Sequence, residues 1–82
     1  MWTPAPDVLV TDLETEVVLL QAGSGEMFQL NASGRAAWFA FPTDTAGVAA
    51  ILIKHGAPEA QAQIDADAWL NDLHTRGLIQ PG

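Results

Sequence analysis

Three short apolar runs in the first part of the chain predict three β-strands joined by tight turns. Val8–Val10 is apolar and rich in β-branched residues, which favours a strand. Glu16–Gln21 is apolar on both faces, as is typical of a central strand. Glu26–Leu30 alternates as a half-buried strand does, with Phe28 and Leu30 on one face. Short connections, one of them bearing glycines, predict an antiparallel meander.

The hydrophobic period changes from that of a strand to that of a helix directly after Leu30. Asn31 can accept hydrogen bonds from the free N–H groups of a helix start, so a first helix is expected over Ala32–Phe41. Cap residues and apolar spacing predict a second helix over Ala46–His55 and a third over Pro58–Arg76. The expected fold is therefore α+β, a three-stranded antiparallel sheet followed by three helices, in an arrangement that resembles a winged helix-turn-helix.

Large apolar side chains in the second half of the chain predict a single core. Trp38, with Phe39 and Phe41, is expected to supply its aromatic bulk, and Leu78–Ile79 to return and cap it. The proline-bearing N-terminus offers Trp2 as a candidate hydrophobic anchor. The core-facing stripe of the third helix, spaced in steps of four and three, comprises Ala62, Ala66, Trp69, Leu70 and Leu73.

Composition limits the classes of partner. The 82 residues fit one domain over 1–82, and a hydrophobic content of 49% argues against disorder. Ten acidic residues against three basic ones give a formal charge of −7, which repels nucleic acid and anionic membranes and favours basic partners. The chain has no cysteine, no apolar run near the roughly 18 residues of a membrane span and no signal peptide pattern. A cytoplasmic protein is expected.

Candidates for chemistry are few. His55 and His74 lie far apart in the sequence and lack a third metal ligand at helical or hairpin spacing. Ser24 and Ser33 fit a turn and the start of a helix, and no lysine or helix follows the glycines around Ser24 as it would in a phosphate loop. A carboxylate pair for acid–base chemistry stays open, without a supporting pocket residue. We therefore expect a non-enzyme with no cofactor and no metal site.

Peptide binding at a strand edge is the remaining class, with Glu26–Leu30 as the candidate edge. The strand would supply a backbone ladder and the third helix a wall whose aspartates select a basic or polar peptide, although the pattern alone favours an edge that binds nothing. The candidate peptide-binding residues are Glu26, Met27, Phe28, Gln29, Leu30, Asp65, Ala68, Trp69 and Asp72. The opposite flank of the helix is the alternative wall and carries Asp67, Asn71 and His74.

Two stretches resemble the PqqD-like family. Gly25–Gly34 contains Phe-Gln-Leu-Asn-Ala-Ser-Gly, Trp38 follows, and Trp69–Ile79 has the spacing Trp-Leu-x-x-Leu-x-x-Arg-Gly-Leu-Ile. The family pattern is a strand ending in Gly-x-Tyr-Phe-x-Leu-Asn-x-Thr-Gly and a closing helix ending in Arg-Gly-Leu, and the resemblance covers about residues 8 to 79. It implies a winged helix-turn-helix that binds the leader of a ribosomally made precursor peptide as an added strand beside the third strand, and presents the precursor to a modifying enzyme.

The resemblance leaves the biosynthetic system open. The stand-alone length and the Gly-x-Met-Phe-Gln-Leu-Asn run favour the separate recognition protein of a lasso-peptide cluster, whose implied partner is a leader peptidase. The alternatives are a pyrroloquinoline quinone-type peptide chaperone, which serves a radical enzyme, and, in a different class, a helix-turn-helix regulator or a structural subunit. Met27 stands where the family often has an aromatic residue, and Ala66 and Asp67 replace bulkier apolar residues, so groove contacts that differ from the family's are expected. The sequence leaves open whether the protein is a monomer or a dimer.

Overall fold

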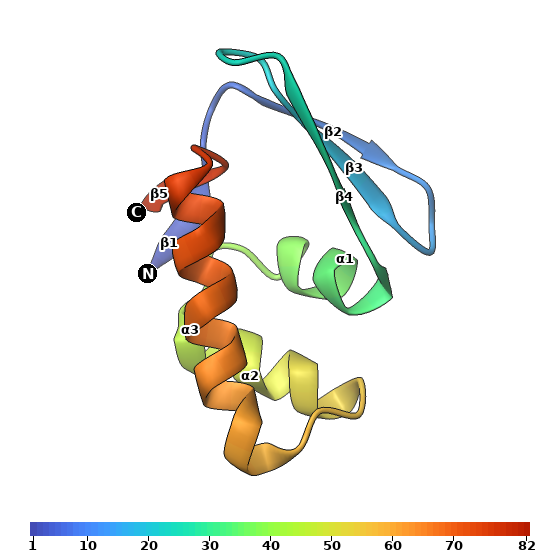
Figure 1. Cartoon of the computed structure of the whole chain (residues 1–82), viewed down its shortest axis with the longest axis vertical. Coiled ribbons are helices and arrows are strands. Elements are labelled where there is room, and N and C mark those ends of the chain that lie inside the picture. Colours follow the sequence, from blue (N-terminus) through green and yellow to red (C-terminus); the bar gives the residue numbers. More distant parts are fainter.

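A computed structural model describes all 82 residues of the chain as five strands and three helices (Figure 1). It has the predicted α+β class, with a three-stranded antiparallel sheet followed by three helices. None of the helices has the length and apolar content needed to cross a membrane. In chain order the elements are β1 (Trp2–Pro4), β2 (Val8–Asp12), β3 (Val17–Gln21), β4 (Glu26–Leu30), α1 (Ala32–Trp38), α2 (Thr45–Lys54), α3 (Glu59–Thr75) and β5 (Ile79–Pro81).

The main sheet has the strand order β2-β3-β4, so β3 is central, as its two apolar faces predicted. Val17 and Leu19 of β3 are fully buried and point toward the helices, where they join the core. The sheet lies at one end of the molecule and α2 at the other, with α1 between them and α3 along one side (Figure 1). Because β2 and β4 each pair on one side only, both are open edges of this sheet.

A second, two-stranded sheet joins the two ends of the chain and was not predicted. β1 pairs antiparallel with β5, and Trp2 also exchanges backbone hydrogen bonds with Thr43. Each strand has three residues and contains a proline, so neither carries enough alternation to be recognised as a strand. The expected return of the C-terminal segment is confirmed, because Leu78 and Ile79 are buried in the core.

The passage from β4 into α1 takes a single residue, Asn31, whose predicted cap is confirmed. Its side-chain Oδ1 accepts a hydrogen bond from the Gly34 N–H at 3.0 Å. A Cβ on Gly34 would lie 3.0 Å from the Cβ of Leu30, which is closer than side chains normally approach. Strand and helix therefore meet at a close contact that favours glycine.

The core confirms part of the predicted aromatic cluster and corrects the rest. Trp38 is buried, and the half-buried Phe41 stacks on Trp69 with ring centres 6.0 Å apart. Phe39, expected in the core, is 51% exposed because α1 ends at Trp38 instead of Phe41, and the Arg35 guanidinium covers its ring. The predicted α3 stripe is correct: Ala62, Ala66, Leu70 and Leu73 are buried and Trp69 packs against the core.

Candidate functional site

The hydrogen-bond pattern of the sheet determines which backbone groups of β4 are free. At the two ends of the β2–β3 ladder, the Ala22 N–H donates to the Asp7 carbonyl and the Leu13 N–H to the Glu16 carbonyl. Antiparallel partners alternate between hydrogen-bonded and non-hydrogen-bonded pairs. The backbone N–H and C=O groups of the even-numbered residues of β3 therefore point toward β2, and those of the odd-numbered residues point toward β4. The register pairs Leu19 with Phe28. The backbone groups of the even-numbered residues of β4 therefore form hydrogen bonds with β3.

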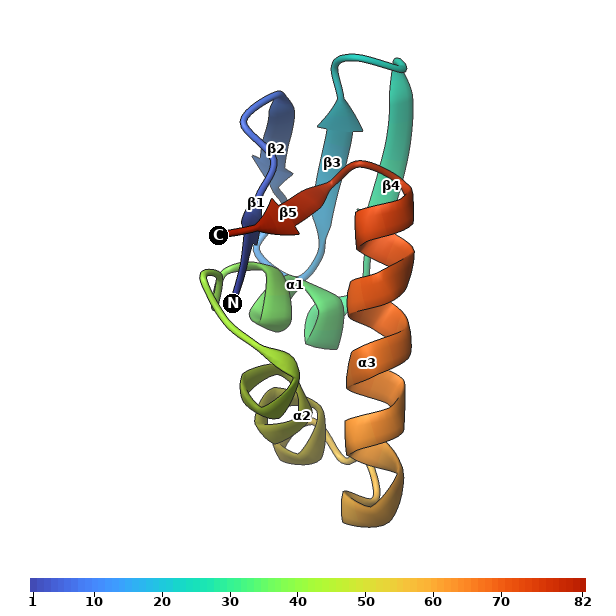
Figure 2. The ribbon, with the colours of Figure 1, turned by 90° about the vertical axis from the view of Figure 1, so that its left-hand side faces the viewer.

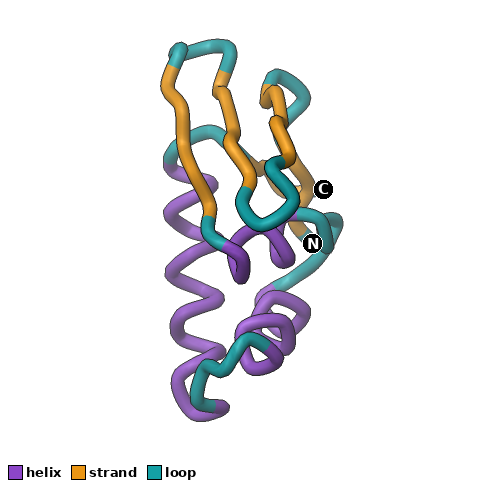
Figure 3. Tube along the Cα trace, turned by 90° about the vertical axis from the view of Figure 1, so that its right-hand side faces the viewer, coloured by secondary structure: helices purple, strands orange, loops and turns teal.

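Met27 and Gln29 consequently direct their N–H and C=O groups toward the open edge of the sheet. This edge runs beside the C-terminal half of α3, as Figures 2 and 3 both show. The side chain of Phe28 points to the helix side, because its partner Leu19 lies in the core. An extended segment placed at this edge would find a hydrogen-bonding strand on one side and a helix on the other.

A first cavity of about 430 Å³ lies where β4 runs into α1 and faces α3. Its size is in the range that holds a large side chain or a small ligand. Leu52 of α2 and Ala57 close the side away from the sheet, and the Asp65 carboxylate is the charged group of its lining. The lining residues are Gln29, Leu30, Asn31, Ser33, Gly34, Ala37, Leu52, Ala57, Asp65 and Trp69.

A second cavity of about 400 Å³ continues along β4 toward the end of α3. The Arg76 guanidinium carbon lies 5.1 Å from the centre of the Phe28 ring, and Arg76 Nε donates to the Asp72 carboxylate at 3.0 Å. The negative charge of Asp72 is thus balanced by Arg76 within the cavity. The lining residues are Met27, Phe28, Gln29, Leu30, Trp69, Asp72, Leu73 and Arg76. Trp69 belongs to both cavities, which together form one groove between β4 and α3.

The structure brings most of the candidate residues together along this groove. It is lined by Met27, Phe28, Gln29, Leu30, Asp65, Trp69 and Asp72. Glu26 and Ala68, two further candidates, are exposed and line neither cavity. The backbone groups of Glu26 bond to β3 at the hairpin end of β4. Ala68 lies on the exposed surface of α3, turned away from the groove.

The alternative flank of α3 lies outside the groove. Asp67 and Asn71 are exposed and hydrogen-bonded to one another, the Asn71 amide donating to the Asp67 carboxylate at 3.4 Å. His74 packs against Trp2, with ring centres 4.8 Å apart. The flank with Asp65 and Asp72 is therefore the one that faces β4.

Sequence reasoning missed Arg76 and the residues that α1 and α2 contribute. In the sequence, Arg76 belongs to the closing Arg-Gly-Leu pattern, which assigns it no contact with a peptide. Its spacing of four residues from Asp72 and seven from Trp69 does place all three on one helix face. Leu52 and Ala57 carried no such signal, because their approach to β4 depends on how α2 packs against α3.

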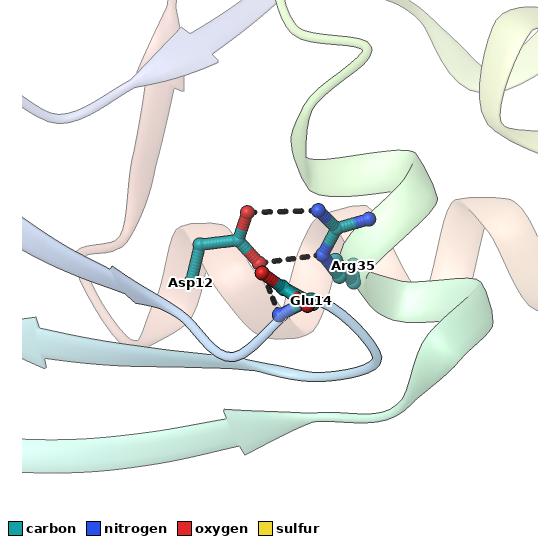
Figure 4. Close-up of polar contacts among 3 residues, drawn as sticks. All are labelled: Asp12, Glu14 and Arg35. Carbon is teal, nitrogen blue, oxygen red and sulfur yellow. Dashed lines mark hydrogen bonds and ion pairs between the residues drawn. The ribbon is translucent and has the colours of Figure 1, made fainter.

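The shorter of the two ion pairs lies at the other edge of the sheet. Arg35 of α1 makes a two-pronged contact with Asp12 at the end of β2, at 2.6 and 2.8 Å (Figure 4). This hydrogen bond, followed by one from the Glu14 N–H, lowers the pKa of Asp12 to about 2. The same contact raises the pKa of Arg35. The pair fastens the β2–β3 hairpin to α1 and leaves the groove open.

The fold and the groove define a small α+β domain with an open edge on its sheet. Residues 16–79 match the family described as Coenzyme PQQ synthesis protein D (PqqD), and the chain belongs to this family. No curated protein sequence matches it.

Two solved structures have the same fold over nearly the whole chain. One is TbiB1 in complex with the TbiA(beta) leader peptide, with a TM-score of 0.84, 22% identity and coverage of 98% of this chain and 96% of that chain. The other is lasso peptide synthetase B1 complexed with the leader peptide, with a TM-score of 0.81, 25% identity and coverage of 98% of both chains.

Proposed function

We propose that this protein is a non-catalytic binding protein that captures the leader region of a ribosomally made precursor peptide as an added β-strand. The observation that carries the proposal is the open edge of β4, where the backbone groups of Met27 and Gln29 face outward beside a groove walled by α3. Membership of the PqqD family supports it. The likeness to a lasso peptide synthetase B1 that is complexed with its leader peptide supports it further.

In the proposed binding mode, the leader pairs with Met27 and Gln29 and directs alternate side chains into the groove. Apolar leader side chains enter the two cavities on either side of Trp69. Asp65 sets a preference for a basic or polar residue at the first cavity. Asp72 contributes less to this preference, because Arg76 already balances its charge.

The bound precursor is then presented to a maturation enzyme. We favour a lasso-peptide system with a separate leader peptidase, because a lasso peptide synthetase B1 has the same fold at 25% identity. A pyrroloquinoline quinone-type peptide chaperone is the second candidate, favoured by the description of the matching family. The protein acts in the cytoplasm, where ribosomal precursors are made.

The arrangement of α2 and α3 supports an interpretation as a winged helix-turn-helix. The helices are joined by residues 55–58, a short turn that contains Gly56, and the β-strands take the place of the wing. A DNA-binding role is not favoured, because the chain carries a charge of −7 and Arg76 near the end of α3 is paired with Asp72. The groove between β4 and α3 is the better-supported binding surface.

Titration of the isotope-labelled protein with leader peptides from neighbouring precursor genes, followed by amide NMR, tests the proposal. Leader capture predicts shifts at Met27 and Gln29 and on the α3 face that carries Asp65, Trp69 and Asp72. Leaders of both the lasso and the quinone type belong in the panel, since preferential binding of one type identifies the system.

A pair of proline variants makes the test specific for strand addition. Met27→Pro removes a backbone donor at the β4 edge and should abolish binding. Val10→Pro is the matched control, because the register places the Val10 N–H at the open edge of β2. It should fold equally well and bind normally. Unchanged affinity of a folded Met27→Pro protein, or equal losses in both variants, would contradict strand addition at β4.

A further inference from the structure

The face of the sheet that points away from the helices carries an apolar row across all three strands. The register pairs Leu9 with Leu20 and Leu20 with Met27, so their side chains lie side by side on this face. Leu9 is 60% exposed and Met27 68% exposed. Figure 3 looks onto these strands, with α1 behind and below them. The row ends at Met27, which is also a residue whose backbone faces the open edge.

The neighbouring row on the same face is polar at the β4 edge. It contains Thr11, Val18 and Gln29 in directly paired positions. The Gln29 side-chain amide donates a hydrogen bond to the Glu16 carboxylate. The two outward positions of β4 thus differ in chemistry, apolar at Met27 and polar with a nearby negative charge at Gln29.

A strand added at this edge continues both rows. Whichever direction it runs, the residue opposite Met27 lies on the outer face, and so does the residue opposite Gln29. The residues between them point into the groove beside α3. The outer face therefore meets side chains of the peptide that the groove does not contact.

We propose that the outer face of the sheet at its β4 edge is a second specificity surface for the captured peptide, with Met27 selecting an apolar side chain opposite it and Gln29 with Glu16 selecting a polar or basic one. This inference rests on the proposed function, and it concerns side chains other than those in the groove. Because the two positions differ, they fix the register of the peptide: a shift by two residues would place the apolar side chain beside the Glu16 carboxylate.

Selection from a random peptide display library tests the inference without a known leader. The wild-type protein should enrich peptides with alternate apolar residues for the groove and one apolar residue at the outward position opposite Met27. Met27→Glu should change that outward position to lysine or arginine and leave the groove positions as they were. A peptide enriched by the wild type should bind Met27→Glu roughly fivefold more weakly, the upper range for one cross-strand pair, and regain affinity after a lysine exchange.

Leu9→Glu is the matched control, since it places the same charge on the same face two strands away from Met27. It should leave the enriched sequences unchanged. Equal changes in both variants would indicate general electrostatics and overturn the inference. If Met27→Glu selects the same peptide sequences as the wild type, the inference is also overturned, provided that these peptides still shift the amide signals of residue 27 and Gln29. Leader capture would then stand. If the wild type enriches no peptide that shifts these amides, both the proposed function and this inference fail.

Discussion

Arg76 lines the groove and lies over Phe28, with the guanidinium carbon 5.1 Å from the ring centre. The contact connects the end of α3 to the middle of β4, and the same guanidinium holds the Asp72 carboxylate. A cation over an aromatic ring at an exposed site contributes about 0.5–1 kcal/mol. Arg76, which follows α3, thereby links the helix wall of the groove to its strand.

Replacing Arg76 by methionine should lower the free energy of unfolding by about 1 kcal/mol. The change removes the contact with Phe28 and the exposed pair with Asp72, which together have about this magnitude. Urea unfolding followed by circular dichroism measures it. Arg76→Lys keeps the charge but not the planar group, so its stability should lie between those of the wild type and Arg76→Met. An unaltered urea midpoint in Arg76→Met would show that the contact does not stabilise the fold.

Asn31→Ala should destabilise the protein by about 1 kcal/mol, because the start of α1 loses its cap. In a domain of this size, that loss lowers Tm by roughly 4–8 °C. Asp44→Ala is a suitable comparison, since Asp44 caps α2 by accepting from the Gly47 N–H at 2.9 Å. Both variants should lose similar stability, but only Asn31→Ala should also weaken peptide binding, because Asn31 lines the first cavity. Equal peptide affinities of the two variants would show that Asn31 caps α1 but does not contribute to peptide binding.

Gly34→Ala should destabilise the protein by about 1–3 kcal/mol, although alanine normally favours a helix over glycine. The added Cβ would meet the Cβ of Leu30 at 3.0 Å and push α1 away from β4. Ser33→Ala, at the adjacent position, should change stability by less than about 0.5 kcal/mol. Thermal unfolding of the two variants gives the comparison, and a stabilised Gly34→Ala protein would contradict the close contact.

The Asp12–Arg35 pair should stabilise the protein in a defined pH range. The pKa of Asp12 falls from 3.8 to about 2 on folding, so the stabilisation is fully present above pH 4 and is lost as the pH falls toward 2. Asp12→Asn should be less stable than the wild type near neutral pH, and the difference should shrink through this range. Unfolding curves of both proteins at several pH values test it; a difference that does not depend on pH would exclude the ion pair as its cause.

The elements with a strong local signal were predictable from the sequence. Glu26–Leu30 has the bounds that its alternation indicated, and Asn31 caps the helix that follows. The buried face of α3 follows from the spacing of its alanines and leucines. In each case, neighbouring residues in the chain carry the information themselves.

The remaining features depend on contacts between distant segments. The prediction of Phe39 in the core was wrong, because the end of α1 and the position of Arg35 decide whether its ring is buried. The pairing of β1 with β5 joins opposite ends of the chain. The groove-facing flank of α3 depends on the packing of α3 against the sheet, which leaves Asp65 beside β4 and His74 beside Trp2.

The single-residue connection at Asn31 has a consequence for the energetics of recognition. With no loop between β4 and α1, the strand cannot move without tilting the helix, and α1 is held in turn by the Asp12–Arg35 pair. We therefore expect the proposed receptor side to be preorganised and to lose little conformational entropy when a peptide binds. Most of the ordering then falls on the flexible peptide, so stiffening that peptide in an extended form is the most direct way to raise its affinity.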